Sequence, residues 1–139
     1  MGVNVIVSLF LFQAALSISP TAAGSSTELR YSEGVLRRKA TKVVMPTYPE
    51  EAIKKGSQGV SVTQVFVDEN GEVYRATVLE APSPSISEAV ERAVKQWRFT
   101  VSSLQRVRIR FQGKLTFYFV IEGGKPRVEN PRQPGSVKG

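Results

Sequence analysis

The stretch "GVSVTQVFVDENGEVYRATVLE", residues 59–80, decides the fold of this chain. Its first nine residues are rich in β-branched side chains and predict a strand over residues 59–67. The segment "VYRATVLE" predicts a return strand over residues 73–80. Between them, Asn70 and Gly71 supply the positive φ angles that a tight hairpin turn requires. The two strands are therefore expected to pair as an antiparallel hairpin.

A helix is predicted directly after this hairpin. Ser85 and Glu88 in "SISEAVERAVKQW" have the spacing of a capping box. Its apolar residues recur at intervals of three and four and share one helical face: Ile86, Ala89, Val90, Ala93, Val94 and Trp97. We expect Trp97 and Phe99 to lie in the core, and the alternative is that they stack on a ligand.

The segment "RVRIRFQGKLTFYFVI" predicts one long final strand from Val107 to Ile121, with a bulge or bend at Gln112-Gly113. Its first polar positions form an arginine stripe: Arg106, Arg108 and Arg110. Charges on an edge strand discourage aggregation, so the stripe either keeps the strand soluble or contacts an anionic partner.

A short helix is predicted ahead of the hairpin, in "MPTYPEEAIKKG", residues 45–56. Pro49 stands at the first helical position, and Gly56 ends the helix. Glu50 and Glu51 compensate the helix dipole; they are not a catalytic pair, because neighbours on a helix point apart. Tyr48 is expected to pack and cap. A helix of so few residues is not stable in isolation, and tertiary packing must therefore stabilise it.

Together these elements predict an α+β fold with a small three-stranded antiparallel or mixed sheet. The compact strand order is second, first, third, with two helices on one face. This arrangement leaves the outer edge of the last strand uncovered. It also leaves one face of the first strand open, where Val60, Val62 and Phe66 lie.

The two ends of the chain differ from this folded unit, which is assigned to residues 45–122. Residues 1–23 carry no charged side chain, and predict a signal peptide or a short membrane anchor through residues 3–18. Residues 24–44 read as a polar basic linker, either solvated or, through "VLRRKATK", in contact with an anionic membrane surface. Residues 123–139 are rich in Gly and Pro and predict a disordered tail.

Composition excludes several classes of function. The net charge of +7 favours anionic partners. The chain has no cysteine and no histidine, so an enzyme is nearly excluded, and neither a cofactor, a metal nor a small-molecule substrate is expected. Nucleic-acid binding is not expected, because no motif for it is present and export argues against it.

From Pro46 to about Ile121 the chain resembles the TonB C-terminal domain family. "PTYPEEAIKKGSQG" is similar to its opening pattern, "VFVDENGEV" to its hairpin, "ISEAVERAVKQWRF" to its helix and "LTFYFVI" to its last strand. The matching structural positions are Tyr48, Pro49, Gly59, Gly71, Trp97 and Phe99. The resemblance implies a periplasmic module whose last strand is an open edge. Through that edge, family members couple inner-membrane energy to outer-membrane transporters.

The expected function is therefore a non-enzymatic periplasmic protein-binding module. A partner segment, from an outer-membrane transporter or a membrane-complex subunit, would pair with the last strand by β-augmentation. The expected contact residues are Leu115, Phe117, Tyr118, Phe119 and Val120, with Arg106, Arg108 and Arg110. The alternative is a structural subunit of an envelope complex that docks through Val60, Val62 and Phe66.

Overall fold

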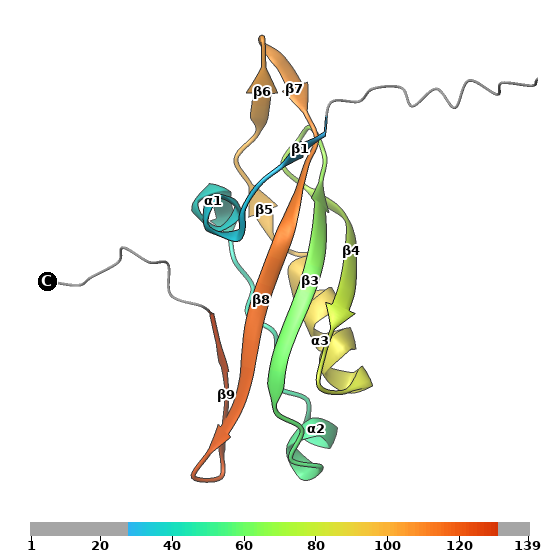
Figure 1. Cartoon of the computed structure of the whole chain (residues 1–139), viewed down its shortest axis with the longest axis vertical. Helices are drawn as coiled ribbons and strands as arrows, with labels where there is room; N and C mark the ends of the chain where they lie inside the picture. The colour runs from blue at the N-terminus through green and yellow to red at the C-terminus, as the bar shows by residue number, and fades with distance from the viewer. Residues whose placement is uncertain (1–27, 131–139) are drawn as a thin grey trace, which may run out of the picture.

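The computed structural model describes residues 28–130 (Figure 1). The main sheet has the order β1-β8-β3-β4, and β9 also pairs with β8. Its strands are β1 (Leu29–Arg30), β3 (Gly59–Val67), β4 (Val73–Glu80), β8 (Phe111–Glu122) and β9 (Lys125–Glu129). Two small sheets pair β2 (Ala40–Lys42) with β5 (Arg98–Phe99), and β6 (Ser102–Leu104) with β7 (Val107–Ile109). The helices are α1 (Glu33–Lys39), α2 (Glu50–Lys54) and α3 (Pro84–Val94).

The predicted centre of the sheet is present, because β4, β3 and β8 lie side by side in the order second, first, third. Both pairings of β3 are antiparallel. The sheet is nevertheless larger than predicted. β1 adds to the start of β8 in parallel, and β9 adds to its end in antiparallel orientation. A third helix, α1, packs beside β8.

Two segments assigned to linker and tail are structured, which corrects the predicted domain limits. Residues 29–42 form β1, α1 and β2, and residues 125–129 form β9. These elements are short and lack a clear period, because their partners lie far away in the sequence: β1 and β9 pair with β8, and β2 pairs with β5. Leu36 is the buried residue that anchors α1 in the core. The predicted signal or anchor, and the end of the predicted tail, lie outside the described residues. Within residues 28–130, no helix is long and apolar enough to cross a membrane.

The predicted long strand is two strands, β7 and β8, separated at Arg110. The expected bulge at Gln112-Gly113 is absent from this pairing, because β3 and β8 stay in register from Gly59↔Phe119 to Val67↔Phe111. Gly113 instead permits a close approach. A Cβ there would lie 2.9 Å from the Tyr31 carbonyl oxygen and 3.0 Å from Leu36 Cδ2. Glycine at this position therefore lets the β1–α1 segment pack directly onto β8.

The core lies between one face of the sheet and the helices. Side chains alternate along β8, so that Phe111, Leu115, Phe117 and Phe119 are buried and face Ile86, Val90, Val94 and Trp97. Trp97 is 1% exposed, and its indole N–H donates to the Val44 carbonyl at 2.8 Å. Ser83, rather than the predicted Ser85, caps α3, because Pro84 occupies the first helical position.

The β3–β4 turn depends on Gly71 for two separate reasons. Its φ is +81°, a conformation that side chains disfavour, whereas Asn70 does not adopt positive φ. A Cβ on Gly71 would also lie 2.1 Å from the Phe99 carbonyl oxygen. The Gly71 carbonyl in turn accepts the Phe99 N–H at 2.9 Å. This turn therefore ties the hairpin to β5.

Replacing Trp97 by alanine should lower the free energy of unfolding by about 3–5 kcal/mol, because a large buried side chain is removed. Trp97→Phe should cost less, since it retains most of the apolar contact and loses the hydrogen bond to Val44. Chemical denaturation of both variants measures this. Equal stability of Trp97→Ala and the parent chain would contradict the packing described.

Gly71→Ala should destabilise more than Gly56→Ala. Both glycines have positive φ, +81° and +64°, which costs a side chain about 1–2 kcal/mol. At Gly56 no atom lies within 4 Å of the added Cβ, whereas at Gly71 the Phe99 carbonyl must move. We therefore expect an additional loss of about 1–3 kcal/mol for Gly71→Ala, measured by thermal or chemical unfolding. Equal losses would mean that the close approach to Phe99 does not matter.

Candidate functional site

The outer edge of β8, which was expected to be open, is covered by three segments of the same chain (Figure 1). At its start, the N–H groups of Leu29 and Tyr31 donate to the carbonyls of Arg110 and Gln112, at 3.1 and 2.9 Å. At its end, β9 pairs with residues 118–122. The prediction of an uncovered edge is therefore wrong, because residues called linker and tail supply the covering segments.

Between these two strands, side chains of α1 take the place of a strand. Glu33 Oε1 accepts the Thr116 backbone N–H at 2.7 Å, and Arg37 Nη2 donates to the Thr116 carbonyl at 2.6 Å. The same two side chains form a salt bridge at 2.6 Å, and the Arg37 side chain is only 8% exposed. Glu33 and Arg37 thus satisfy both outward-facing peptide groups of Thr116.

These contacts show which peptide groups of β8 face the outer edge. The outer partners bind the backbone of Arg110, Gln112 and Thr116, so even-numbered residues direct their peptide groups to this edge. By the same period of two, Tyr118 and Val120 direct theirs toward β9. The peptide groups of Phe119 face β3, where Phe119 lies opposite Gly59. The peptide groups of the predicted contact residues Leu115 and Phe117 likewise face β3, and the side chains of both residues are buried in the core.

β9 is held mainly by its backbone. A two-residue turn with positive φ at Gly123 (+57°) and Gly124 (+75°) connects it to β8, as hairpins favour. All of its side chains are exposed except Val128, which is half-buried against the core. Arg127 forms exposed ion pairs with Glu122 and Glu129 at 2.6 and 2.8 Å. Exposed pairs of this kind contribute little to stability.

The predicted arginine stripe does not lie along the outer edge of β8. Arg106 is in the β6–β7 turn, and Arg108 is on β7. Arg110 precedes β8 and donates to Glu69 at 2.9 Å. A backbone hydrogen bond at Glu69, followed by this guanidinium, lowers the pKa of the Glu69 carboxyl. The structure therefore separates the arginines from Tyr118 and Val120.

The predicted open face of β3 is present. Ser61, Thr63, Val65 and Val67 are buried beneath the helices, whereas Val60, Val62 and Phe66 are half-exposed on the other face. Phe66 is covered by the guanidinium of Arg75 at 3.9 Å and lies 6.1 Å from the Tyr74 ring. Partial desolvation is the first cause that raises the pKa of Tyr74, although this side chain remains 46% exposed. Charged and aromatic groups therefore cover part of this apolar face.

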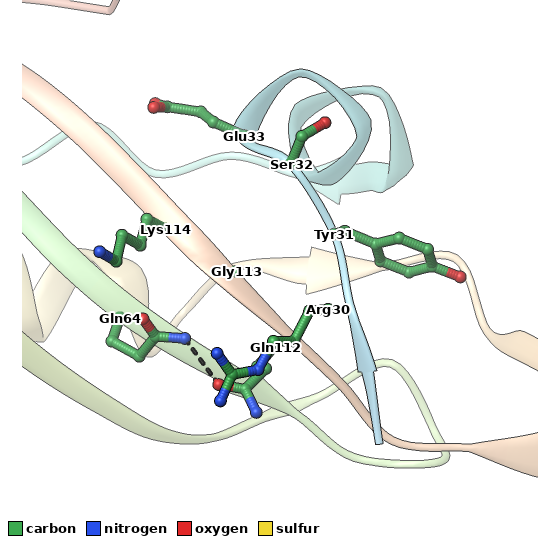
Figure 2. A pocket seen from close by; sticks show the side chains of 8 residues that line it. All are labelled: Arg30, Tyr31, Ser32, Glu33, Gln64, Gln112, Gly113 and Lys114. Atoms are coloured by element: carbon green, nitrogen blue, oxygen red, sulfur yellow. Dashed lines mark hydrogen bonds between the residues drawn. The ribbon is translucent and has the colours of Figure 1, made fainter. Parts of the chain in front are cut away.

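A small pocket opens beside this face, where β1 meets β8 and the start of α1 (Figure 2). Its volume is about 350 Å³, and Gln64 donates to Gln112 at 2.8 Å within it. Arg30 and Lys114 also line it, as does Glu33, whose carboxylate is engaged with Arg37 and Thr116. Across residues 28–130, no group of three or more acidic side chains is placed to hold a metal.

The residues expected to be structural lie where the hairpin and helices meet. Tyr48 is buried, packs edge-on against Phe119 at 5.2 Å and donates to the Ser57 carbonyl. Pro49 caps α2, one position before its predicted place. Gly59 begins β3 with φ of +143°.

The sequence analysis did not predict the roles of Glu33, Arg37 and β9. The spacing of four residues between Glu33 and Arg37 was nevertheless a helix signal within the supposed linker.

Comparison with known proteins agrees with this architecture. The family model described as "Gram-negative bacterial TonB protein C-terminal" matches residues 29–121. The chain is 37% identical to protein TonB of Yersinia enterocolitica over 62 residues, 44% of this chain and 24% of that protein. It is 27% identical to protein TonB of Vibrio cholerae serotype O1 over 108 residues, 75% of this chain and 43% of that one. The chain therefore matches less than half the length of either relative.

A solved structure gives the same result for the fold. The solution NMR structure of the Pseudomonas aeruginosa TonB CTD superposes with a TM-score of 0.50 and 29% identity, over 64% of this chain and 89% of that one. The family match begins at Leu29 and thus includes β1 and α1, which the sequence alone assigned to a linker. From this match, and from the sheet and helices that agree with it, the chain belongs to the Gram-negative bacterial TonB protein C-terminal family.

Proposed function

We propose that this chain is a non-enzymatic protein-binding module of the bacterial periplasm that takes an extended segment of an outer-membrane transporter onto β8. The partner segment replaces β9 along residues 118–122. The proposal rests on one observation: the outer edge of β8 is closed at residues 118–122 by the five-residue strand β9, whose side chains are almost all exposed. Residues 1–23 export the chain or anchor it in the inner membrane.

Replacement of β9 is favoured over addition outside it. Pro126 lies opposite Ile121, and the peptide groups of Ile121 face β3. The backbone at position 126 therefore faces away from β8, on the outer edge of β9. Proline has no N–H to donate there, and prolines on an edge prevent strand addition. A partner strand thus has complete hydrogen-bonding positions on β8 and an incomplete set on β9.

The exchange is nearly neutral in backbone hydrogen bonds, because the partner strand forms the bonds that β9 gives up. Each such bond contributes only about 0.5–1.5 kcal/mol net. β9 has the advantage of a short covalent connection, which gives an effective concentration of about millimolar. A partner must therefore compensate with side-chain contacts, for which Tyr118 and Val120 are exposed and half-exposed. A partner segment that offers only backbone pairing would therefore not displace β9 from β8.

A structural subunit is the second candidate function, and the open face of β3 favours it. Val60 and Tyr118 lie opposite each other there, and Val62 lies between Glu80 and Thr116. A protein docked on this face would cover Val60, Val62 and Phe66 without disturbing β9. Val62→Ser would then weaken the complex, whereas changes on β9 would not.

Two proline substitutions on β8 should separate binding from folding. Tyr118→Pro removes an N–H that faces β9 or a partner, so the fold should persist and partner binding should be lost. Phe119→Pro removes an N–H directed to β3 and also a buried phenyl ring, so it should destabilise the sheet, by about 3–5 kcal/mol from the ring alone. Thermal unfolding measures the stability of the fold, and capture of transporters from solubilised outer membranes measures partner binding. Full capture by a folded Tyr118→Pro variant would exclude pairing on this edge.

Locking β9 in place should block partner binding reversibly. The chain has no cysteine, so Ile121→Cys with Pro126→Cys introduces one disulfide between directly opposite residues. The oxidised form should capture transporters weakly, and reduction of the same sample should restore capture. The control is the pair of single variants, which should not respond to reductant. If oxidised and reduced forms bind equally, binding does not require β9 to leave β8. Single Ile121→Cys, which keeps Pro126, then separates the open face of β3 from strand addition on the outer edge of β9, because only the second needs the N–H that Pro126→Cys supplies.

A further inference from the structure

The β6–β7 hairpin is an amphipathic ribbon. Ser102 pairs with Ile109 and Leu104 with Val107, so these four side chains share one face, while Ser103 and Arg108 share the other. The shared face is buried at its base, where Ile109 is 7% exposed. It opens to solvent at the tip, where Leu104 and Val107 are 47% and 64% exposed. In Figure 1 this hairpin projects at the end of the molecule opposite α2 and the β8–β9 turn.

The charge at this tip has one sign. Residues 100–110 contain three arginines and no acidic residue. Arg110 is paired with Glu69, whereas Arg106 and Arg108 have no ion-pair partner among residues 28–130. The supposed basic linker is partly neutralised, because Arg37 is bound to Glu33 and Lys39 lies over the rings of Tyr31 and Phe111, although Arg38 and Lys42 have no ion-pair partner in the same range. At the hairpin tip, unpaired positive charge lies beside two exposed aliphatic side chains.

The turn of the hairpin keeps polar side chains where glycine would be easier to accommodate. Gln105 and Arg106 have φ of +50° and +66°, the left-handed conformation that such a turn requires. Glycine and asparagine are the residues that hairpin turns of this kind favour. Side chains held in a disfavoured conformation are a reason to look for function. Here they add hydrogen-bonding and cationic groups around the exposed pair Leu104 and Val107.

We propose that the tip of the β6–β7 hairpin binds an anionic phospholipid bilayer. Leu104 and Val107 enter the boundary between headgroups and acyl chains, and Arg106 and Arg108 contact the phosphates. Size favours a bilayer over a protein partner, because stable protein interfaces bury roughly 1,200–2,000 Å² and a two-residue tip is far too small. Binding at a membrane interface instead scales with the apolar area inserted and with the attraction of neighbouring basic residues to anionic lipids, so a small tip can contribute to it. The edge of β8 stays available for a partner.

A dye on the hairpin tests this contact in the full chain. Ser103→Cys gives a single thiol on the ribbon for a polarity-sensitive fluorophore, and Lys125→Cys gives a matched exposed site near the β8–β9 turn. With vesicles of phosphatidylcholine and phosphatidylglycerol, we expect a blue shift at position 103 and none at position 125. Vesicles of phosphatidylcholine alone should give no shift at either site. A shift at position 125 only, or none at position 103, would overturn the proposal.

Substitutions identify the groups responsible. Arg106→Gln with Arg108→Gln should weaken the contact of the tip with the anionic vesicles, read from the dye at position 103, roughly 25-fold, since each basic residue at a membrane surface contributes about fivefold. Leu104→Ser with Val107→Ser should weaken it about tenfold, and Leu79→Ser, an equally exposed leucine on β4, should leave it unchanged. Thermal unfolding should be unaltered in all three. Unchanged vesicle binding of the first two variants, or loss of transporter capture instead, would refute the membrane contact.

Discussion

The pairing of β3 with β8 is the interaction on which the rest of the structure depends. Nine residues of each strand are opposite one another without a break, from Gly59↔Phe119 to Val67↔Phe111. This register places Phe117 and Leu115 on the same side as Val65 and Val67, so that one continuous apolar surface forms for α3 and Trp97 to cover. A shift by one residue would turn these side chains to solvent, which is why the register is specific.

The same register directs alternate peptide groups of β8 outward, where the chain binds those of Gln112, Thr116 and residues 118–122 by three different means. β1 and β9 supply backbone groups, and α1 supplies the carboxylate of Glu33 and the guanidinium of Arg37. The β1–α1 segment is anchored by Leu36 in the core, whereas β9 contributes half-buried Val128 and is followed by Asn130, which accepts from Arg37 at 3.1 Å. Of the three segments that cover β8, β9 therefore has exposed side chains at all positions but one, and it is the segment that we propose a partner strand replaces. Binding elements are commonly drawn from such weakly held segments.

Three regions of the surface differ in chemistry, and this separates their proposed roles. The edge at Tyr118 and Val120 would offer backbone hydrogen bonds once β9 had left it. The open face of β3 offers apolar groups partly covered by Arg75, and the β6–β7 tip offers aliphatic groups beside unpaired arginines. Because the tip projects away from the β8–β9 turn, a bilayer contact at one end and a partner strand at the other are compatible (Figure 1).

The sequence by itself determined the centre of the fold, because its signals there are local. The turn at Gly71, the alternation of β3 and the apolar stripe of α3 each follow from neighbouring residues, and together they predicted the order β4-β3-β8, the burial of Trp97 and the open face at Val62. Tertiary structure alone decided the coverage of β8. β1, α1 and β9 are too short to carry a period, and β9 has a polar, Gly-flanked sequence that reads as a tail. Such segments become ordered because a strand far away in the sequence offers them hydrogen bonds. The residue pattern within the segment does not identify that strand.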